Sequence, residues 1–122
     1  MTLYEELGDE LLKKLVDSFY DRVLLDDRIA HLFTSDLNLI KSKQFMFLSQ
    51  FLGGPGRYTA EYGHPRMRMR HMPHTVTPSA AIAWLENMKA SIYSLDISRD
   101  LQERLYQRFP HVAAHMVNKA DS

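Results

Sequence analysis

The 122-residue sequence contains no cysteine. Disulfide bridges, thiolate zinc sites, iron–sulfur clusters and cysteine nucleophiles are therefore excluded. Net charge is also absent, with 15 basic residues against 15 acidic ones, so no overall field attracts nucleic acid or an anionic membrane. No apolar run is long enough to span a membrane, and the first residues lack the pattern of a signal peptide. These absences predict a cytoplasmic protein without nucleic-acid or membrane partners.

The length is that of one domain, which we expect to span residues 1–122. Glycine is scarce and methionine frequent, and no stretch alternates in the manner of a strand. The main helices are predicted where apolar residues recur at helical spacing, in residues 7–24, 37–51, 78–95 and 98–116. Two shorter helices are expected, at residues 26–33 and 65–72. Residues 57–65 are expected to form an ordered loop with at most one helical turn.

Several residues mark where these helices begin and end. The glycine-rich residues 53–56 are predicted to stop the second main helix. Thr77 and Ser98 are predicted N-caps, and Pro78 suits the first helical position. Pro110 removes a backbone donor and predicts a kink or break in the last helix. The expected fold is therefore all-α.

Four polar residues, one on each of four predicted helices, interrupt otherwise apolar faces: Tyr20, Gln44, His71 and Trp84. Burying an unpaired polar group costs about 1–3 kcal/mol. A cavity that holds a small ligand would give Tyr20, Gln44 and Trp84 a common partner, with His71 binding a metal from the other side of a flat cofactor. Taken singly, a tyrosine or a tryptophan such as Tyr20 or Trp84 more often belongs to an ordinary core.

The segment of residues 62–74 places three histidines and three arginines around two prolines. A histidine on a short helical turn among cations is suited to a metal cofactor that carries negative charge, and haem fits that description. His71 is the candidate iron ligand, and Arg70 would face the propionates. The alternative is a cofactor-free helical binding module that uses the basic residues 66–70 on nucleic acid or a protein. His111 and His115 lie four apart, but without a nearby third ligand they suggest an exposed pair.

The sequence resembles the truncated haemoglobins, and specifically their group II, over nearly its whole length. No single matching segment is specific for this group, but the occurrence of all the segments in the same order along the chain is specific. The matching pieces are residues 19–23, 32–33, 35–36, 50–55 with Tyr58, 63–65, 68–73, 83–85 and 114–118.

This resemblance implies a two-over-two helical sandwich, a globin-like fold, around haem b (iron protoporphyrin IX). It makes His71 the proximal ligand, Tyr20 and Trp84 the distal hydrogen-bonding pair, and Gln44 a further distal donor. Ile40, at the distal gate, cannot donate a hydrogen bond, which leaves a ligand to the other three. Further contacts with haem are implied for Phe33 on its face, for Phe47, and for Lys43, Tyr58 and Arg70 at the propionates.

The function implied by the resemblance is reversible binding of O₂, and of NO, CO and sulfide, at ferrous iron. Hydrogen bonds to a charged acceptor in a dry cavity contribute about 1.5–3 kcal/mol each, so we expect high O₂ affinity. Such a site suits nitric oxide dioxygenation or peroxidase-type chemistry as well as binding. Turnover would require an external reductase, because the sequence contains no flavin or nicotinamide motif.

Overall fold

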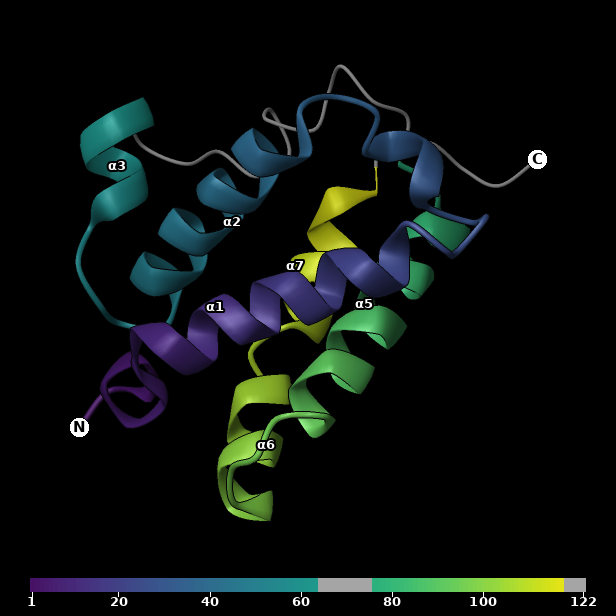
Figure 1. Cartoon of the computed structure of the whole chain (residues 1–122). Helices are drawn as coiled ribbons and strands as arrows, with labels where there is room; N and C mark the ends of the chain where they lie inside the picture. Colours follow the sequence, from purple (N-terminus) through teal and green to yellow (C-terminus); the bar gives the residue numbers. More distant parts are fainter. Residues whose placement is uncertain (64–75, 118–122) are drawn as a thin grey trace.

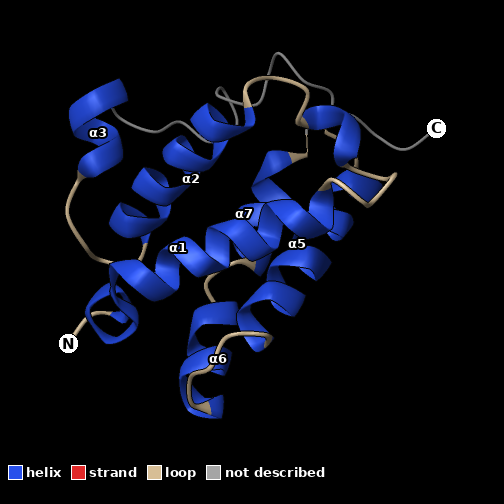
Figure 2. Cartoon of the chain, in the orientation of Figure 1, coloured by secondary structure: helices blue, strands red, loops and turns tan. Residues whose placement is uncertain are grey.

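The computed structural model describes residues 1–63 and 76–117. Within these ranges every regular element is helical (Figures 1 and 2), and none is long and apolar enough to cross a membrane. The elements are α1 (Leu3–Val23), the 3₁₀ turn η1 (Ala30–Leu32), α2 (Leu37–Phe51), α3 (Arg57–Tyr62), α5 (Pro78–Tyr93), α6 (Arg99–Tyr106) and α7 (Pro110–Met116).

Helix α1 begins four residues earlier than predicted, at Leu3. Thr2 and Glu5 form a reciprocal capping box that starts it. Gly8 then adopts φ +80° inside the helix, a conformation that favours glycine, and this kink hides the first turn from a search for helical periodicity. The predicted end of this helix was also wrong in one detail. Leu24 was expected to be the last residue of the apolar row, but it follows the helix and is 38% exposed.

The other predicted helix starts agree with the structure, but the helix predicted for residues 78–95 ends two residues earlier, at Tyr93. The Asp36 carboxylate caps α2, the Thr77 hydroxyl caps α5, and the Ser98 hydroxyl caps α6. Pro78 is the first residue of α5. Pro110 begins α7, so the predicted break divides the last helical stretch into α6 and α7.

Two shorter segments differ from their predictions. The expected helical turn in residues 26–33 is a 3₁₀ turn at Ala30–Leu32 that follows two hydrogen-bonded turns. Residues 57–62 form the six-residue helix α3, which is longer than the single turn allowed within the predicted loop. This helix shows no apolar period because one buried ring, that of Tyr58, holds it against α2. The predicted helix at residues 65–72 lies outside the described residues.

The start of the chain packs on the glycine-rich turn after α2. The Tyr4 backbone N–H donates to the Leu52 carbonyl at 3.0 Å. A Cβ on Gly54 would lie 2.5 Å from the Tyr4 ring, and one on Gly53 would lie 2.9 Å from Thr2. Glycine at these positions therefore permits the close approach of the first turn of α1.

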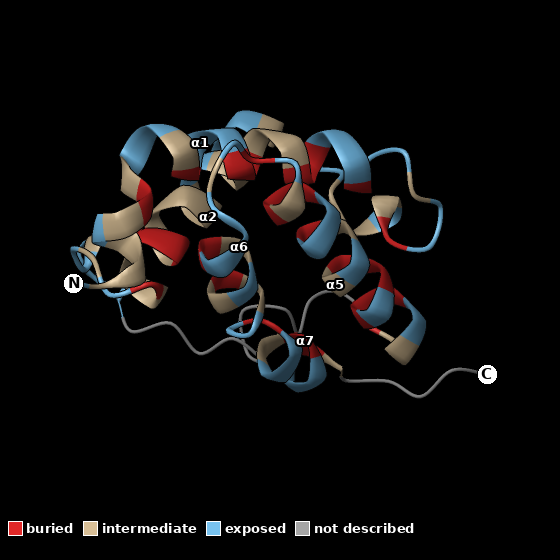
Figure 3. Cartoon of the chain, turned by 90° about the horizontal axis from the view of Figure 1, so that it is seen from below, coloured by how far each residue is buried: buried red, intermediate tan, exposed pale blue. Residues whose placement is uncertain are grey.

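The helices form two layers, with α1 and α2 on one side and α5, α6 and α7 on the other (Figure 1). Helix α1 contacts α2, α5 and α6, and its fully buried residues share one core with those of the second layer. Helix α2 is different, because Ile40, Gln44 and Phe47 on its inward face are only half-buried. Figure 3 shows this contrast between buried and intermediate positions. The incomplete burial marks a cavity beside α2.

Candidate functional site

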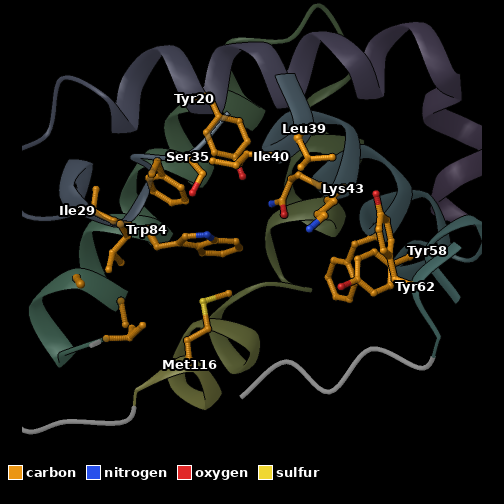
Figure 4. Close-up of a pocket in the computed structure, with 17 residues that line it drawn as sticks. Tyr20, Ile29, Ser35, Leu39, Ile40, Lys43, Tyr58, Tyr62, Trp84 and Met116 are labelled. Carbon is orange, nitrogen blue, oxygen red and sulfur yellow. The ribbon is translucent and has the colours of Figure 1, made fainter. Parts of the chain in front are cut away.

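A cavity of about 450 Å³ lies between α2, α5 and α7, beside the last turns of α1 (Figure 4). Of the ten site residues predicted from the sequence, His71 and Arg70 lie outside the described residues. All of the other eight line this cavity, and they are Tyr20, Phe33, Ile40, Lys43, Gln44, Phe47, Tyr58 and Trp84.

Tyr20 contributes a phenol from the last turns of α1. Its side chain is 3% exposed, and its ring packs edge-on against Phe19 at 5.0 Å and Phe33 at 5.3 Å between centroids. Burial raises the pKa of the Tyr20 hydroxyl above its usual range, so the group remains a protonated donor near neutral pH. No described residue forms a hydrogen bond with this hydroxyl, which points into the cavity in Figure 4.

Trp84 and Gln44 add two more donors from α5 and α2. The Trp84 ring is 6% exposed and is held by Phe19 at 5.4 Å and Phe109 at 5.9 Å between centroids. Within the described ranges, neither the indole N–H nor the Gln44 amide has a hydrogen-bond partner. Figure 4 shows the nitrogen-bearing edge of Trp84 on the side that faces Tyr20. We call Tyr20, Gln44 and Trp84 the donor wall.

The far side of the cavity carries a cation and two phenols, Lys43, Tyr58 and Tyr62, which we call the cation wall (Figure 4). The Lys43 ammonium lies 5.0 Å from the centre of the Tyr62 ring, and the Tyr58 and Tyr62 rings are 5.1 Å apart. Phe47 packs edge-on against Tyr58 at 6.0 Å. A positive charge beside phenols at the rim of an apolar cavity suits the anionic edge of a ligand.

A polar cluster anchors α3 behind the cation wall. The Arg57 guanidinium donates to both Asp9 carboxylate oxygens at 2.9 and 3.1 Å, and to the hydroxyls of Ser49 at 3.0 Å and Tyr4 at 3.1 Å. The Tyr4 hydroxyl donates to Asp9 at 2.6 Å. The hydrogen bonds from Arg57 and then from Tyr4 hold the pKa of Asp9 below its usual range. The cluster thus fixes the residue that precedes Tyr58.

A second polar cluster supports the donor wall from outside. The Asn87 amide, on α5, donates to Asp26 at 2.9 Å and to the carbonyl of Ala83 at 2.7 Å, one residue before Trp84. Arg28 pairs with Asp26 and with Glu86, each at 2.8 Å. The hydrogen bonds from Arg28 and then from Asn87 hold the pKa of Asp26 well below its usual range. The cluster joins the turn after α1 to α5.

Comparison with known proteins identifies the protein family of this chain. The family model of the bacterial-like globins matches residues 2–118. The chain belongs to this family. Over 119 residues it is 43% identical to the group 2 truncated haemoglobin YjbI of Bacillus subtilis, covering 98% of this chain and 90% of that one. It is therefore a member of the group 2 truncated haemoglobins, as the sequence pattern predicted, and the expected two-over-two helical sandwich is confirmed.

Solved structures of truncated haemoglobins agree closely with the fold of this one. The crystal structure of the group II truncated haemoglobin from Bacillus anthracis has a TM-score of 0.93 and 38% identity, covering 99% of each chain. The X-ray structure of a truncated oxygen-avid haemoglobin from Bacillus subtilis has a TM-score of 0.90 and 43% identity, covering 97% of this chain and all of that one.

Membership of the globin family implies a haem cofactor and the binding of O₂ and other diatomic molecules by this truncated haemoglobin. The described residues fit such a group. The apolar rings of Phe33 and Phe47 face the cavity, and Lys43 places positive charge at its rim. The donor wall then supplies polar groups that the protein itself leaves without described partners.

The truncated haemoglobin cavity also includes nine residues that sequence reasoning did not assign to a site. Tyr62 shares the cation wall, and Met116 reaches the cavity from α7 (Figure 4). Met116 carried a usable signal, because it continues the apolar row of the last helical stretch. Tyr62 carried none, since α3 lacks apolar periodicity. The remaining seven are Ile29, Leu32, Ser35, Leu39, Val76, Ala80 and Ala81.

Proposed function

We propose that this globin holds haem b in the cavity, with His71 as the iron ligand, and that it binds O₂ reversibly and with high affinity. The observation that carries the proposal is the donor wall: Tyr20, Gln44 and Trp84 come from three helices, line one cavity, and have no described hydrogen-bond partner. A small ligand that accepts hydrogen bonds would satisfy all three. The proposed globin domain spans residues 1–122.

The haem, when bound, supplies an iron atom that takes O₂, NO, CO or sulfide. The donor wall then determines how firmly a ligand stays. The Trp84 indole N–H and the Tyr20 O–H would each donate to a small ligand with partial negative charge, and each such bond contributes about 1.5–3 kcal/mol in a dry site. Ile40 and Phe33 exclude water without donating hydrogen bonds themselves. The similarity to an oxygen-avid truncated haemoglobin of Bacillus subtilis supports the same expectation of high affinity.

The cation wall positions the cofactor in this proposal. Lys43, Tyr58 and Arg70 would hold the haem propionates, since an ammonium, a guanidinium and a phenol all donate to carboxylates. Lys43 already lies at the cavity rim beside Tyr62. Phe47 packs against Tyr58 and so holds the apolar part of this contact in place.

Slow release of O₂ favours chemistry at the site over delivery. We therefore include nitric oxide dioxygenation or peroxidase-type turnover in the proposal, with electrons from an external reductase, because the sequence contains no flavin or nicotinamide motif. Tyr20 would contribute here as a protonated hydrogen-bond donor, and burial moves its pKa still further above the pH of such reactions.

The test is the dissociation rate of O₂ from the wild type and from the Trp84→Phe and Tyr20→Phe variants, measured by stopped flow. Loss of the indole donor is expected to raise the rate about tenfold to a hundredfold, since each 1.4 kcal/mol is a factor of ten. Tyr106→Phe is the matched control, because it removes a phenol that does not line the cavity. An unchanged rate in Trp84→Phe contradicts the assigned role of the donor wall.

The cofactor-free alternative rests on residues 66–70, which lie outside the described residues. An absorption spectrum of the purified protein, compared with that of His71→Ala, separates it from the proposal. A Soret band that is lost or shifted in His71→Ala supports iron ligation by His71. A colourless wild type that does not take up haemin supports the binding module instead.

A further inference from the structure

Two histidines lie side by side on the outer face of α7, away from the cavity. His111 and His115 are both exposed, while Ala113 and Met116 on the same helix are buried. The Nε2 atoms of the two histidines are 2.8 Å apart, and their ring centres are 4.2 Å apart at an interplanar angle of 76°. The spacing of four residues brings the rings together across one helical turn. The two ring nitrogens are thus joined by a hydrogen bond at the surface, in which one ring donates and the other accepts.

The distance between the two nitrogens matches the geometry of a particular class of metal ion. Imidazole nitrogens bind divalent first-row ions at about 2.0–2.1 Å. Two nitrogens at a right angle around such an ion are therefore about 2.8–3.0 Å apart, whereas a tetrahedral ion requires about 3.3–3.4 Å. The observed 2.8 Å fits the right angle of tetragonal or octahedral coordination. That geometry is typical of Cu²⁺ and Ni²⁺ with nitrogen and oxygen ligands.

We propose that His111 and His115 form a surface site for a divalent transition-metal ion of the copper or nickel type, separate from the haem cavity. The ion replaces the hydrogen bond between the two rings. Within the described part of the chain, no group of three or more histidines and carboxylates could hold a metal. Among the described residues the two imidazoles are therefore the protein ligands of the proposed site, and water can occupy further positions on the ion.

The metal would also change the helix that holds it. Helix α7 has seven residues and no side-chain hydrogen bond at its N-cap residue, Phe109. Helices this short are marginal without outside support. An ion that joins residues 111 and 115 restrains one turn and favours the folded helix by binding it preferentially. Met116, which lines the haem cavity from α7, is then held more firmly.

The test is calorimetric titration of Ni²⁺ into the ferric holoprotein, so that neither metal changes its oxidation state. His111→Ala and His115→Ala are each expected to weaken the strongest Ni²⁺ site about tenfold or more, because one of two ligands is lost. Both side chains are exposed, so these variants should fold. His31→Ala is the matched control, since it removes an exposed imidazole from η1. Zn²⁺ is expected to bind more weakly than Ni²⁺.

Three results would overturn the proposal. The first is equal Ni²⁺ affinity in the wild type and both α7 variants. The second is loss of affinity in a His64→Ala/His74→Ala double variant with the α7 variants unaffected, which would place the site elsewhere. The third is an unchanged rate of amide hydrogen exchange in residues 111–116 on adding Ni²⁺, which would show that no ion bridges the turn. Slower exchange in the wild type alone supports the bridge.

Discussion

The two walls of the proposed haem cavity are built by different means. The donor wall rests on buried aromatic packing between long helices, in which Phe19 contacts both Tyr20 and Trp84. The two phenols of the cation wall lie on the six-residue helix α3, whose anchor is the partly exposed cluster around Arg57, while Lys43 comes from α2. Apolar packing is insensitive to salt and pH, whereas exposed ion pairs respond to both. We therefore expect ligand control to be robust and cofactor retention to be adjustable.

The largest effect on the donor wall is expected from Phe19→Ala. Phe19 is fully buried and touches both rings of the donor wall, so its loss leaves a cavity in the core. The expected cost is about 3–5 kcal/mol in the free energy of unfolding, read from urea denaturation. The O₂ dissociation rate should rise in the same variant. Ile82→Ala, at a 54% exposed position, should change stability by no more than about 0.5 kcal/mol.

Arg57→Ala should affect the cation wall and leave the donor wall unchanged. Its guanidinium joins Asp9, Tyr4 and Ser49, so its removal loosens α3 and with it Tyr58. We expect the rate of haem transfer to an acceptor protein to rise roughly twofold to fivefold, in keeping with a partly exposed ion pair. High salt should raise the wild-type rate toward that of the variant. An increase in the O₂ dissociation rate equal to that of haem loss would remove the distinction between the walls.

Asp26→Asn tests how the support of the donor wall depends on pH, because Asp26 belongs to the polar cluster outside that wall. Arg28 and Asn87 depress the pKa of Asp26 in the folded state. In the unfolded chain its pKa is about 3.9, so the stabilisation is fully present above that value. It decreases as the pH falls below about 4, where the unfolded state binds the proton first. Urea midpoints between pH 2 and pH 5 should therefore fall less steeply in Asp26→Asn than in the wild type or in Asp21→Asn.

The sequence predicted the fold well wherever the signal was local. Thr77 with Pro78, Ser98 and Pro110 marked helix boundaries because capping and the missing proline donor act within a few residues. The first turn of α1 was missed because Gly8 interrupts the period. Helix α3 was missed for another reason, since it is held by Arg57 and Tyr58 through contacts with distant residues. Such contacts do not produce a regular spacing of apolar residues in the sequence.

The site was predictable to the extent that its residues violate the patterns around them. Tyr20, Gln44 and Trp84 each place a polar group on an apolar face, and this anomaly predicted the cavity that they share. Val76 and Ala81 line the same cavity but are ordinary apolar residues, and nothing distinguishes them from the core. Assigning distal and proximal roles depended on the resemblance to the truncated haemoglobins. Packing between helices, which sets the walls, is not encoded at short range.

The missing side chain at Gly54 has a consequence well beyond its own turn. Only a hydrogen atom fits between that backbone and the ring of Tyr4, whose hydroxyl also bonds with Asp9 and Arg57. A methyl group there would push the aromatic ring outward and separate the beginning of the chain from α3. Glycine at position 54 thus lets the first turn of α1 and helix α3 pack together beside the cavity, although Tyr4 and Arg57 are 53 positions apart.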